Sequence, residues 1–386
     1  MDDYKVFHDC IHGLMTIHSL CARIIDTPEF QRLRNLKQTG FCYWVFPGAC
    51  HNRFEHSLGT GFLARKMTEE LKRHQPDLPL TSEDLLCVEI AGLCHDLGHG
   101  PFSHTWERFV QATGISWQHE DMSTKLLQYI IDKYSLKGEF LQFGLSEVHI
   151  SFIKCLINGN KMTDKGIHPF WNQKGFLWDI VANKRNGIDV DKCDYFLRDS
   201  YHLGIKNTFN HERMMKFARA LFIPGQGWQI CFREKEANNL QDMFYQRAQL
   251  HRRAYQHKVN CILECMFIDA MLKANDSFTL FDLSGLPSFV SDEHYCLRGI
   301  VVDFGMKQEN PLQSVHFYVK HSPEKPFHLP NESLFLGPKR FLEEKVLLLS
   351  RTEDPEIIAA LQASFCQTIG SLGLIGGYCS INGAEH

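Results

Sequence analysis

The chain has 386 residues, of which 41 are Lys or Arg and 45 are Asp or Glu, so its formal net charge at pH 7 is −4. This near balance, with a sequence pI of about 6.6, excludes a generally polybasic surface of the kind that coats nucleic acids or anionic membranes. Hydrophobic residues make up 44% of the chain, and no apolar run reaches the ~18 residues of a membrane-spanning helix. We expect a globular protein without a membrane segment, and the acidic first residues predict no secretion signal.

The chain is rich in cysteine and histidine, with 14 and 21 residues respectively. The cysteines show no CxxC pairs and no regular spacing, so we expect reduced thiols in a chain without a predicted secretion signal. Cys87 and Cys94 lie within apolar runs and are expected to be buried. The histidines invite a hypothesis of metal binding or acid–base catalysis, which their positions must decide.

The first half of the chain predicts one β-hairpin followed by helices. Residues 4–18 alternate around a His-Gly pair, which predicts a short hairpin. Thr27 precedes Pro28 and apolar residues at helical spacing, so we expect a helix with Thr27 as its N-cap. Helical spacing recurs over 57–74. A Thr-x-x-Asp capping box opens a helix over 84–94 that is apolar on nearly all sides, so we expect it in the core.

The second half changes character near residue 276, where we place a boundary. Before it, residues 221–233 predict a hairpin around a Pro-Gly-Gln-Gly turn. Residues 236–274 contain no Gly or Pro and predict one long helix with at most a slight break. After the boundary, Pro and Gly increase, and strands are expected over 299–304 and 314–319.

The sharpest local signal is the run HDLGHGPFSH from His95 to His104, which directly follows the predicted core helix. A buried helix that ends in adjacent His and Asp and then breaks at Gly and Pro can direct both side chains into one pocket. Imidazole and carboxylate ligands together suit Zn, Fe or Mn rather than Ca. The alternative is a pair of helix-terminal residues with solvated side chains, and this is the better interpretation of a His-Asp pair that stands alone.

Two further segments favour the metal interpretation. His56 lies in the segment NRFEHS at the start of a predicted helix. Asp191, Tyr195 and Asp199 are four residues apart, so they share one helical face. Carboxylates on successive turns of an apolar helix are unfavourable unless they meet a cation or hydrogen-bond donors.

The order His56, His95-Asp96, Asp191 matches the H…HD…D signature of the HD superfamily of metal-dependent phosphohydrolases. Four longer segments recur together in one group of that superfamily, and the chain closely resembles the vertebrate SAM- and HD-domain deoxynucleoside triphosphate triphosphohydrolases. The resemblance is near-continuous over residues 4–275 and weaker over 299–365. The segments that carry it are residues 42–57, 90–104, 184–192 and 250–259.

The resemblance implies a mainly α fold, an HD-domain helical bundle with short β-hairpins and a small α+β C-terminal lobe. We find no SAM domain, and most of the regulatory lobe that follows Asp276 in the family is missing. The implied divisions are an HD phosphohydrolase domain at 1–275, a bridge at 276–298, a truncated C-terminal regulatory lobe at 299–368 and a disordered tail at 369–386.

Members of that family cleave a dNTP to a deoxynucleoside and intact inorganic triphosphate. The resemblance implies a divalent transition metal, Zn, Fe or Mn, that activates a water and polarises the α-phosphate, with Mg accompanying the nucleotide. The implied consequences are a smaller dNTP pool and, as in the family, restriction of retroviruses. The implied metal ligands are His56, His95, Asp96 and Asp191.

The remaining catalytic residues follow from the same resemblance. His104 would protonate the departing 5′-oxygen, and Glu107 stands where an Asp usually orients that histidine. His99 and His119 would contact the phosphates and stabilise the charge that develops there.

The long predicted helix carries a charged face that supplies substrate residues. Arg247, His251, Tyr255 and Lys258 recur at i, i+4, i+8 and i+11, which without the resemblance would most simply be a solvated basic stripe. The resemblance places Tyr255 under the sugar, where a ribose 2′-hydroxyl would clash. The triphosphate and the 3′-hydroxyl would be bound by Arg53, Lys192, Tyr195, Arg247, Gln38 and Asp199.

Family members also assemble by binding nucleotides between subunits. The resemblance implies a homo-oligomer, a dimer or a tetramer, with GTP or dGTP as activator and a dNTP at an adjacent site. His8 departs from an Asn at the second site, which leaves its base preference open. The guanine site matches Lys5, Val6, Asp26, Gln31 and Arg34, and the dNTP site matches Val45, Phe46, Arg213, Phe217, Arg233, Lys235, Asn239 and Lys258.

Two other functions stay open at the level of sequence. The missing part of the lobe favours a regulatory relative that binds nucleotides and joins oligomers but turns over poorly. Lys184, Arg185, Arg252 and Arg253 favour a binder of single-stranded nucleic acid, although the net charge of −4 argues against it. We expect a location in the nucleus or the cytoplasm, without secretion.

Overall fold

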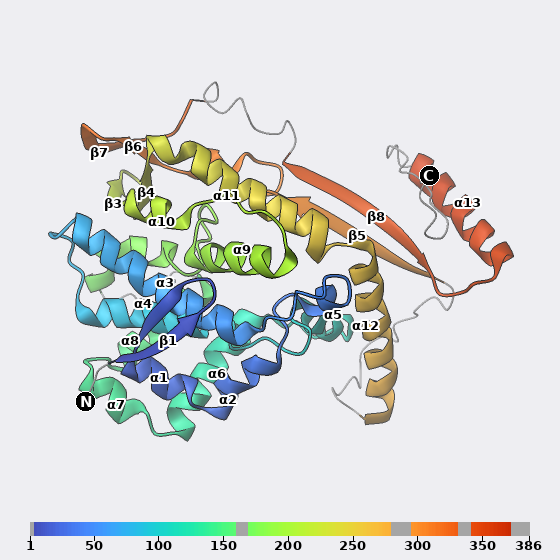
Figure 1. The fold of residues 1–386 in the computed structure, drawn as a ribbon, viewed down its shortest axis with the longest axis horizontal. Helices are drawn as coiled ribbons and strands as arrows, with labels where there is room; N and C mark the ends of the chain where they lie inside the picture. Colours follow the sequence, from blue (N-terminus) through green and yellow to red (C-terminus); the bar gives the residue numbers. More distant parts are fainter. Residues whose placement is uncertain (1–3, 160–168, 279–294, 331–340, 372–386) are drawn as a thin grey trace. The chain divides into compact units, whose positions relative to one another are not determined.

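Helices dominate the structure, which confirms the mainly α fold (Figure 1). Contacts divide the chain into two compact units, and every site residue predicted from the sequence lies in the first. The first unit comprises Met1–Leu280 and Val302–Leu342, and the second comprises Phe281–Val301 and Glu343–His386. The structure, a computed structural model, describes residues 4–159, 169–278, 295–330 and 341–371.

The first unit consists of helices joined by short connections and two small sheets. Its α-helices are α1 (Ser19–Ile25), α2 (Pro28–Gln31), α3 (Arg53–His74), α4 (Ser82–Cys94), α5 (His104–Ala112), α6 (His119–Lys133), α7 (Lys137–Gln142), α8 (Glu147–Asn158), α9 (Val190–Leu203), α10 (His211–Lys216), α11 (Ala237–Leu250) and α12 (Lys258–Phe278). Its strands are β1 (Tyr4–Asp9), β2 (Gly13–His18), β3 (Ala218–Ile223), β4 (Gly227–Arg233), β6 (Phe317–Val319) and β7 (Ser322–Phe327). The 3-10 helices are η1 (Arg32–Asn35), η2 (Gly40–Trp44), η3 (Pro169–Asp179), η4 (Glu234–Glu236) and η6 (Pro311–Ser314), and η5 (His251–Tyr255) is a π-helix.

Helices α3 and α4 lie side by side in the core and carry the first two motifs. The predicted capping box opens α4, because the Thr81 hydroxyl accepts from Asp84 N at 3.3 Å and the Asp84 carboxylate accepts from Thr81 N at 2.9 Å. The α4 side chains from Leu86 to Cys94 are buried, as predicted. A Cβ atom at Gly92 would lie 2.9 Å from the Ala64 Cβ, so the glycine is what allows the close approach of the two helices.

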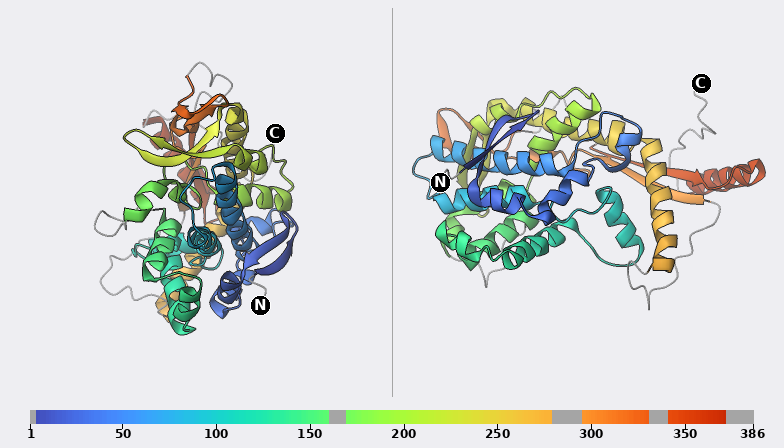
Figure 2. Two further views of the ribbon diagram at one scale, coloured as in Figure 1. Left: turned by 90° about the vertical axis from the view of Figure 1, so that its left-hand side faces the viewer. Right: turned by 60° about the horizontal axis from the view of Figure 1, so that its bottom comes forward.

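Both predicted hairpins are confirmed. Strands β1 and β2 pair antiparallel and lie beside α1 and α3 (Figure 2). Strands β3 and β4 pair antiparallel and continue into a four-stranded sheet ordered β3-β4-β6-β7, in which β4 and β6 run parallel. The strand predicted over 314–319 is shorter than expected: β6 begins at Phe317, and Ser314 ends the 3-10 helix η6. Because β6 belongs to Val302–Leu342, this part of the chain packs within the first unit.

Helix α9 begins at a side-chain cap and ends at a glycine. Asp189 caps its first turn by accepting from Lys192 N at 3.2 Å. Gly204 ends it in the left-handed region at φ +66°, which favours glycine. The helix predicted after Thr27 is shorter than expected, because the single turn of α2 passes into the 3-10 helix η1.

The helix predicted over 236–274 is broken near its middle. The chain leaves the π-helix η5 at Gln256, whose φ of −112° and ψ of 27° are not helical, and restarts as α12. The Asn260 side chain donates to the Tyr255 carbonyl at 2.6 Å and so satisfies an oxygen freed by the break. The predicted basic face is therefore not continuous: Lys258, after the break, is exposed.

The second unit is described from β5 (Tyr295–Asp303) onward. Strand β5 pairs with β8 (Leu342–Ser350), and α13 (Pro355–Ser371) follows. Strand β5 confirms the strand predicted over 299–304. Most of the predicted bridge at 276–298 and most of the predicted tail at 369–386 lie outside the described residues. No helix in the described ranges is long and apolar enough to cross a membrane.

Candidate active site

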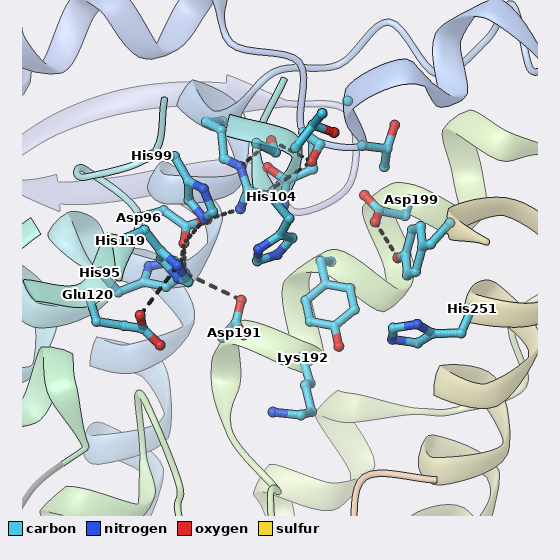
Figure 3. A pocket seen from close by; sticks show the side chains of 18 of the residues that line it. His95, Asp96, His99, His104, His119, Glu120, Asp191, Lys192, Asp199 and His251 are labelled. Atoms are coloured by element: carbon cyan, nitrogen blue, oxygen red, sulfur yellow. Dashed lines mark hydrogen bonds and ion pairs between the residues drawn. The ribbon is translucent and has the colours of Figure 1, made fainter. Parts of the chain in front are cut away.

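A cavity of about 570 Å³ lies within the first unit (Figure 3). One wall, which we call the histidine end, presents His95, Asp96, His99, His104, His119 and Asp191. The other wall, which we call the tyrosine end, presents Asp199, His251 and Tyr255, and Gln38 is linked to it through His51. The cavity is lined by all the residues predicted to bind substrate, namely Gln38, Arg53, Lys192, Tyr195, Asp199, Arg247, His251 and Tyr255.

The four predicted metal ligands meet at the histidine end. His56 Nε2 lies 3.2 Å from His95 Nε2 and 3.1 Å from Asp191 Oδ1, and this oxygen lies 3.3 Å from His95 Nε2. Asp96 places Oδ2 3.3 Å from His56 Nε2 and Oδ1 3.4 Å from His95 Nε2. These separations match the edges of a coordination polyhedron whose metal–ligand bonds are about 2.1 Å long.

Asp96 also pairs with the buried Arg53. Arg53 Nη1 donates to Asp96 Oδ2, and its other nitrogens donate to Ser103 Oγ at 3.1 Å and to the Gln38 carbonyl at 3.2 Å. Burial alone would raise the pKa of Asp96, but Arg53 and the surrounding histidines lower it well below its ordinary value. Asp96 is thus held as a carboxylate. The possible ligand atoms of His56, His95 and Asp191 all lie within 4.8 Å of one another, so these three residues form a group that could hold a metal ion.

Hydrogen bonds at the outer ring nitrogens orient the two imidazoles. His95 Nδ1 lies 2.7 Å from the Gly92 carbonyl, to which it donates, so the bare Nε2 faces the cavity. His56 Nδ1 lies 2.7 Å from Asp194 Oδ2, which orients its Nε2 in the same way. Both rings therefore present their Nε2 lone pairs to the point where the carboxylates of Asp96 and Asp191 also converge.

Asp194 is a functional residue that the sequence analysis did not name. It binds His12 Nε2 at 2.7 Å and accepts from Arg198 at 2.9 and 2.8 Å, and Arg198 also donates to Asp9 at 2.9 Å. Burial would raise the pKa of Asp194, but Arg198, His12 and His56 together lower it well below its ordinary value. A sequence signal existed, because Asp194 and Arg198 are spaced i, i+4 on the predicted helix.

A second histidine group lies beside the first. The rings of His99 and His119 stack with centroids 3.9 Å apart, and His99, His104 and His119 are close enough to share one ion. Glu107 Oε2 lies 3.2 Å from His104 Nδ1 and 3.5 Å from His119 Nδ1. Burial would raise the pKa of Glu107, but hydrogen bonds from these two histidines lower it to about 2. The longer side chain of Glu107 thus reaches His104 as a carboxylate.

Asp199 joins the side chains of the tyrosine end. Its Oδ2 accepts from the Tyr255 hydroxyl, and its Oδ1 lies 2.6 Å from Nε2 of the buried His51. Burial and the neighbouring Asp199 raise the pKa of Tyr255 well above its ordinary value, so the hydroxyl keeps its proton. Across the described residues, the buried Gln38 Oε1 finds no hydrogen-bond partner. An unpaired oxygen in a cavity wall is an acceptor open to a ligand or to water.

Cationic side chains complete the cavity wall. Lys192 Nζ lies 2.9 Å from Asp189 Oδ2, and although burial would lower the pKa of Lys192, Asp189 raises it overall. Arg247 Nε donates to Asp303 Oδ1 at 3.2 Å, and Arg247 Nη1 lies 3.5 Å from the Tyr195 hydroxyl. Two cations that face a cavity suit an anionic ligand such as a polyphosphate.

Other residues of the cavity wall were missed by the sequence analysis. Glu120 places a carboxylate oxygen 3.3 Å from His119 Nδ1. Arg108 Nη1 donates to Glu264, which ties α5 to α12 at the edge of the cavity. Arg108 follows His104 by four residues, so the shared helical face was a usable signal. Glu264 carried no such local signal, and neither did His51, which lies behind the cavity wall.

The residues predicted to form the guanine-nucleotide site lie outside the cavity lining. Lys5 Nζ pairs with Asp26 Oδ1 at 3.1 Å, and Arg34 Nε donates to Gln31 Oε1 at 2.8 Å. Val6 is exposed beside them on β1. The structure thus gathers these residues near the first hairpin, and nucleotide binding there stays a prediction.

The residues predicted for the adjacent dNTP site fall into two sets. Phe217 carries three cations around its ring, with Lys235 Nζ 3.6 Å from the ring centroid and Arg213 and Arg233 at 5.6 and 5.5 Å. Asn239 bonds the nearby Asn210 backbone at 2.8 and 2.9 Å. The second set comprises Val45, Phe46 and Lys258, where Phe46 contacts His257 with ring centroids 6.2 Å apart.

Comparisons with known proteins agree with the geometry. The HD domain family matches residues 53–197, a range that contains all four predicted metal ligands. An HD domain implies a divalent metal, and the His/Asp group supplies suitable donors. The chain is similar to three proteins named deoxynucleoside triphosphate triphosphohydrolase SAMHD1. It is 49% identical to the Homo sapiens protein, in an alignment that covers 95% of this chain and 74% of the relative. It is 38% identical to the Gallus gallus protein over 95% of this chain and 75% of the relative. It is 50% identical to the Bos taurus protein over 75% of this chain and 51% of the relative.

The human alignment runs over 461 positions, more than the 386 residues of this chain. The human relative therefore has residues within the aligned region that this chain lacks.

Proposed function

Because the chain belongs to the SAMHD1 family of deoxynucleoside triphosphate triphosphohydrolases, we propose that it hydrolyses dNTPs to deoxynucleosides and inorganic triphosphate. One observation carries the proposal: a His/Asp group that could hold a metal, two cations and the half-buried Tyr255 bonded to Asp199 face the same cavity of about 570 Å³. A nucleoside triphosphate has a polyanionic end and a neutral end, and the cavity matches both.

The donor set at the histidine end fits a divalent transition metal. Two imidazole nitrogens with oriented lone pairs and carboxylate oxygens at 3.1–3.4 Å from them suit Zn, Fe or Mn. Such a metal, when bound, supplies Lewis-acid chemistry that activates a water and polarises the α-phosphate. Mg²⁺ would enter with the triphosphate of the substrate. The residues that would hold the transition metal are His56, His95, Asp96 and Asp191.

His104 supplies the proton that the reaction requires. A bond forms between the water oxygen and the α-phosphorus, the bond from that phosphorus to the 5′-oxygen breaks, and the departing oxygen takes a proton. The His104 ring is exposed to the cavity, and its Nδ1 lies 3.2 Å from the Glu107 carboxylate. Burial lowers the pKa of His104, and the Glu107 carboxylate opposes this by stabilising the imidazolium form, which leaves Nε2–H for the leaving oxygen.

The two cations, together with His99 and His119, bind the triphosphate. Lys192 and Arg247 face the cavity, and Arg suits bidentate binding of phosphate. Burial and the nearby Arg53 hold the pKa of His99 well below its ordinary value, so His99 is neutral and has one N–H that can donate to a phosphate oxygen. With His119 stacked on it, His99 stabilises the charge that develops on the phosphates.

The tyrosine end selects the sugar. Gln38 and Asp199 would bond the 3′-hydroxyl, and the unpaired Gln38 Oε1 is free to accept from it. The Tyr255 ring, anchored by its hydroxyl to Asp199, would leave no room for a 2′-hydroxyl. A ribonucleotide would then meet a steric clash that a deoxyribonucleotide avoids.

Regulation by nucleotides is the finer part of the proposal. The cation-rich ring of Phe217 and the Lys5–Asp26 pair support binding of GTP or dGTP and of a dNTP outside the cavity, within a homo-oligomer. The enzyme would act in the nucleus or the cytoplasm, where dNTP pools are used. The residues that this chain lacks relative to the 461-position alignment favour a second candidate, a regulatory relative with weak turnover.

Product analysis tests the proposal. The purified full chain, loaded with Fe, Zn or Mn, is incubated with dATP and Mg²⁺, with and without GTP, and the products are separated by ion-exchange chromatography. We expect deoxyadenosine and triphosphate in equal amounts. The formation of dADP and phosphate would contradict the proposed bond cleavage, and a metal-loaded chain that binds dATP without any product would favour the regulatory candidate.

A further inference from the structure

His51 lies behind the tyrosine end and contacts both residues proposed to bind the sugar 3′-hydroxyl. Its Nε2 lies 2.6 Å from Asp199 Oδ1, and its backbone carbonyl accepts from Gln38 N at 3.1 Å. His51 is 2% exposed and is absent from the cavity lining, so it can act on a ligand only through its neighbours. We propose that His51 is a positioning residue that sets the selectivity of the site for 2′-deoxy sugars bearing a 3′-hydroxyl. This inference rests on the proposed function.

The surroundings of His51 fix its tautomer and its orientation. Its Nδ1 is buried and has no hydrogen-bond partner within the described ranges. An N–H at that position would be an unsatisfied buried donor, so the proton belongs on Nε2, which donates to Asp199. The ring stacks on His202 with centroids 4.3 Å apart and planes 13° apart. The packing therefore holds an N–H donor at one oxygen of Asp199.

Two fixed donors determine the plane of the Asp199 carboxylate. His51 occupies Oδ1 and the Tyr255 hydroxyl occupies Oδ2. A carboxylate has about four acceptor positions, so lone pairs remain for a ligand hydroxyl. Without the His51 donor, Asp199 is free to rotate, and the anchor of the Tyr255 ring moves with it. His51 thus couples recognition of the 3′-hydroxyl to exclusion of a 2′-hydroxyl.

Backbone hydrogen bonds around His51 allow its contact with Asp199 to be tested without disturbing its contact with Gln38. Lys37 and Asn52 form an isolated antiparallel bridge, and Arg53 N donates to the Leu36 carbonyl at 2.8 Å. These bonds hold the main chain beside Gln38 without help from the His51 side chain. A substitution of His51 should therefore disturb Asp199 and leave the position of Gln38 in place.

The test compares two variants of His51 in the full chain. The His51→Met variant keeps the volume and removes the donor, whereas the His51→Gln variant carries an amide N–H near the position of Nε2. The measured quantities are kcat/KM for dCTP, for CTP and for the 3′-deoxy analogue ddCTP, with GTP and metal held constant. The ratios between substrates are independent of the fraction of active enzyme, so partial misfolding does not change them. The matched control is the His316→Gln variant, because His316 is a buried histidine that directly precedes β6.

In the His51→Met variant, we expect the ratio of kcat/KM for dCTP to kcat/KM for each analogue to fall by about tenfold, because one hydrogen bond to a charged group is removed. The fall should come mainly from a higher KM for dCTP. The His51→Gln variant should recover most of the preference, and the His316→Gln variant should match the unchanged chain. Equal ratios in the unchanged chain and the His51→Met variant would overturn the inference. Equal losses in the two His51 variants would also overturn it, because packing rather than a donor would then matter.

The inference can fail separately from the proposed function. If the unchanged chain hydrolyses none of the three nucleotides, the proposed function fails, and His51 is then tested by binding. The α,β-imido analogues of dCTP, CTP and ddCTP serve as probes in calorimetry, and the ratios of Kd replace the ratios of kcat/KM. Binding ratios that do not change in the His51→Met variant would overturn the inference on their own.

Discussion

The two ends of the cavity are built on different principles. At the histidine end, ionisable groups that are buried or half-buried approach within 3.1–3.4 Å of one another, an arrangement that a cation among them would stabilise. At the tyrosine end, Asp199 receives hydrogen-bond donors on both oxygens, and Gln38 Oε1 has no partner among the described residues. Substitutions at the histidine end should therefore lower the rate of hydrolysis strongly, whereas substitutions at the tyrosine end should change the preference for one sugar over another.

The largest effect is expected from a metal ligand. In the Asp191→Asn variant, one anionic ligand becomes a neutral amide, so metal content and hydrolysis should both fall, the latter by about 10³-fold or more. Metal analysis and dATP turnover measure the two quantities. The exposed Asp77, in Asp77→Asn, is the matched control and should change neither. Full activity in the metal-depleted Asp191→Asn variant would show that the histidine end is not a metal site.

The second largest effect is expected at His104. The His104→Gln variant lacks the proton donor but retains every proposed metal ligand, so kcat should fall by about 10²–10⁴-fold while metal content stays the same. Steady-state kinetics with dATP measure the loss. The exposed His321, in His321→Gln, is the control. A loss that appears only in KM would assign His104 to substrate binding instead of proton transfer.

A variant of Asp194 tests the orientation of His56 at the histidine end without removing a proposed metal ligand. The Asp194→Asn variant replaces the carboxylate that orients His56 Nδ1 at 2.7 Å, so metal affinity should fall by about 10–100-fold. Competition with a chromophoric chelator measures the affinity. Asn keeps the shape of the side chain, and a melting temperature close to that of the unchanged chain would show that the fold is retained. Unchanged metal affinity in a folded variant would mean that Asp194 serves only the core.

The smallest effect on rate is expected at the tyrosine end. The Tyr255→Phe variant removes the hydroxyl bonded to Asp199 and keeps the ring, so turnover of dATP should change by a few-fold at most. The preference for dATP over ATP should nevertheless fall, because the ring loses its anchor. Competition between the two nucleotides in one reaction measures this ratio. A collapse of turnover with the preference intact would reverse the roles assigned to the two ends.

Local features of the fold were predictable from the sequence because they depend on neighbouring residues. The capping box at Thr81 and the turn between β3 and β4 each need only a few adjacent side chains. The break at Gln256 was not predictable in the same way, because the absence of Gly and Pro favours a continuous helix and the π-helix depends on tertiary packing. The parallel pairing of β4 with β6 likewise joins segments far apart in the chain.

In the candidate site, too, features that depend on neighbouring residues were predictable and contacts between distant residues were not. The ligands His95 and Asp96 were identifiable because they follow a core helix in a recognisable motif. The residues that orient the site were missed where the link is long: His12 reaches Asp194 across 182 positions, and His51 reaches Asp199 across 148. No periodicity or spacing in the sequence reveals such a contact, and only the folded chain brings the partners together.

The central claim is that the histidine end directs water to the α-phosphorus while the tyrosine end holds the departing deoxynucleoside. Hydrolysis of dATP in ¹⁸O-labelled water, followed by mass spectrometry of both products, tests it most directly. The account predicts one ¹⁸O atom in the triphosphate and none in the deoxyadenosine, because the bond from the α-phosphorus to the 5′-oxygen breaks. Label in the 5′-hydroxyl of deoxyadenosine would contradict the account, since water would then have attacked carbon at the end of the cavity assigned to sugar selection.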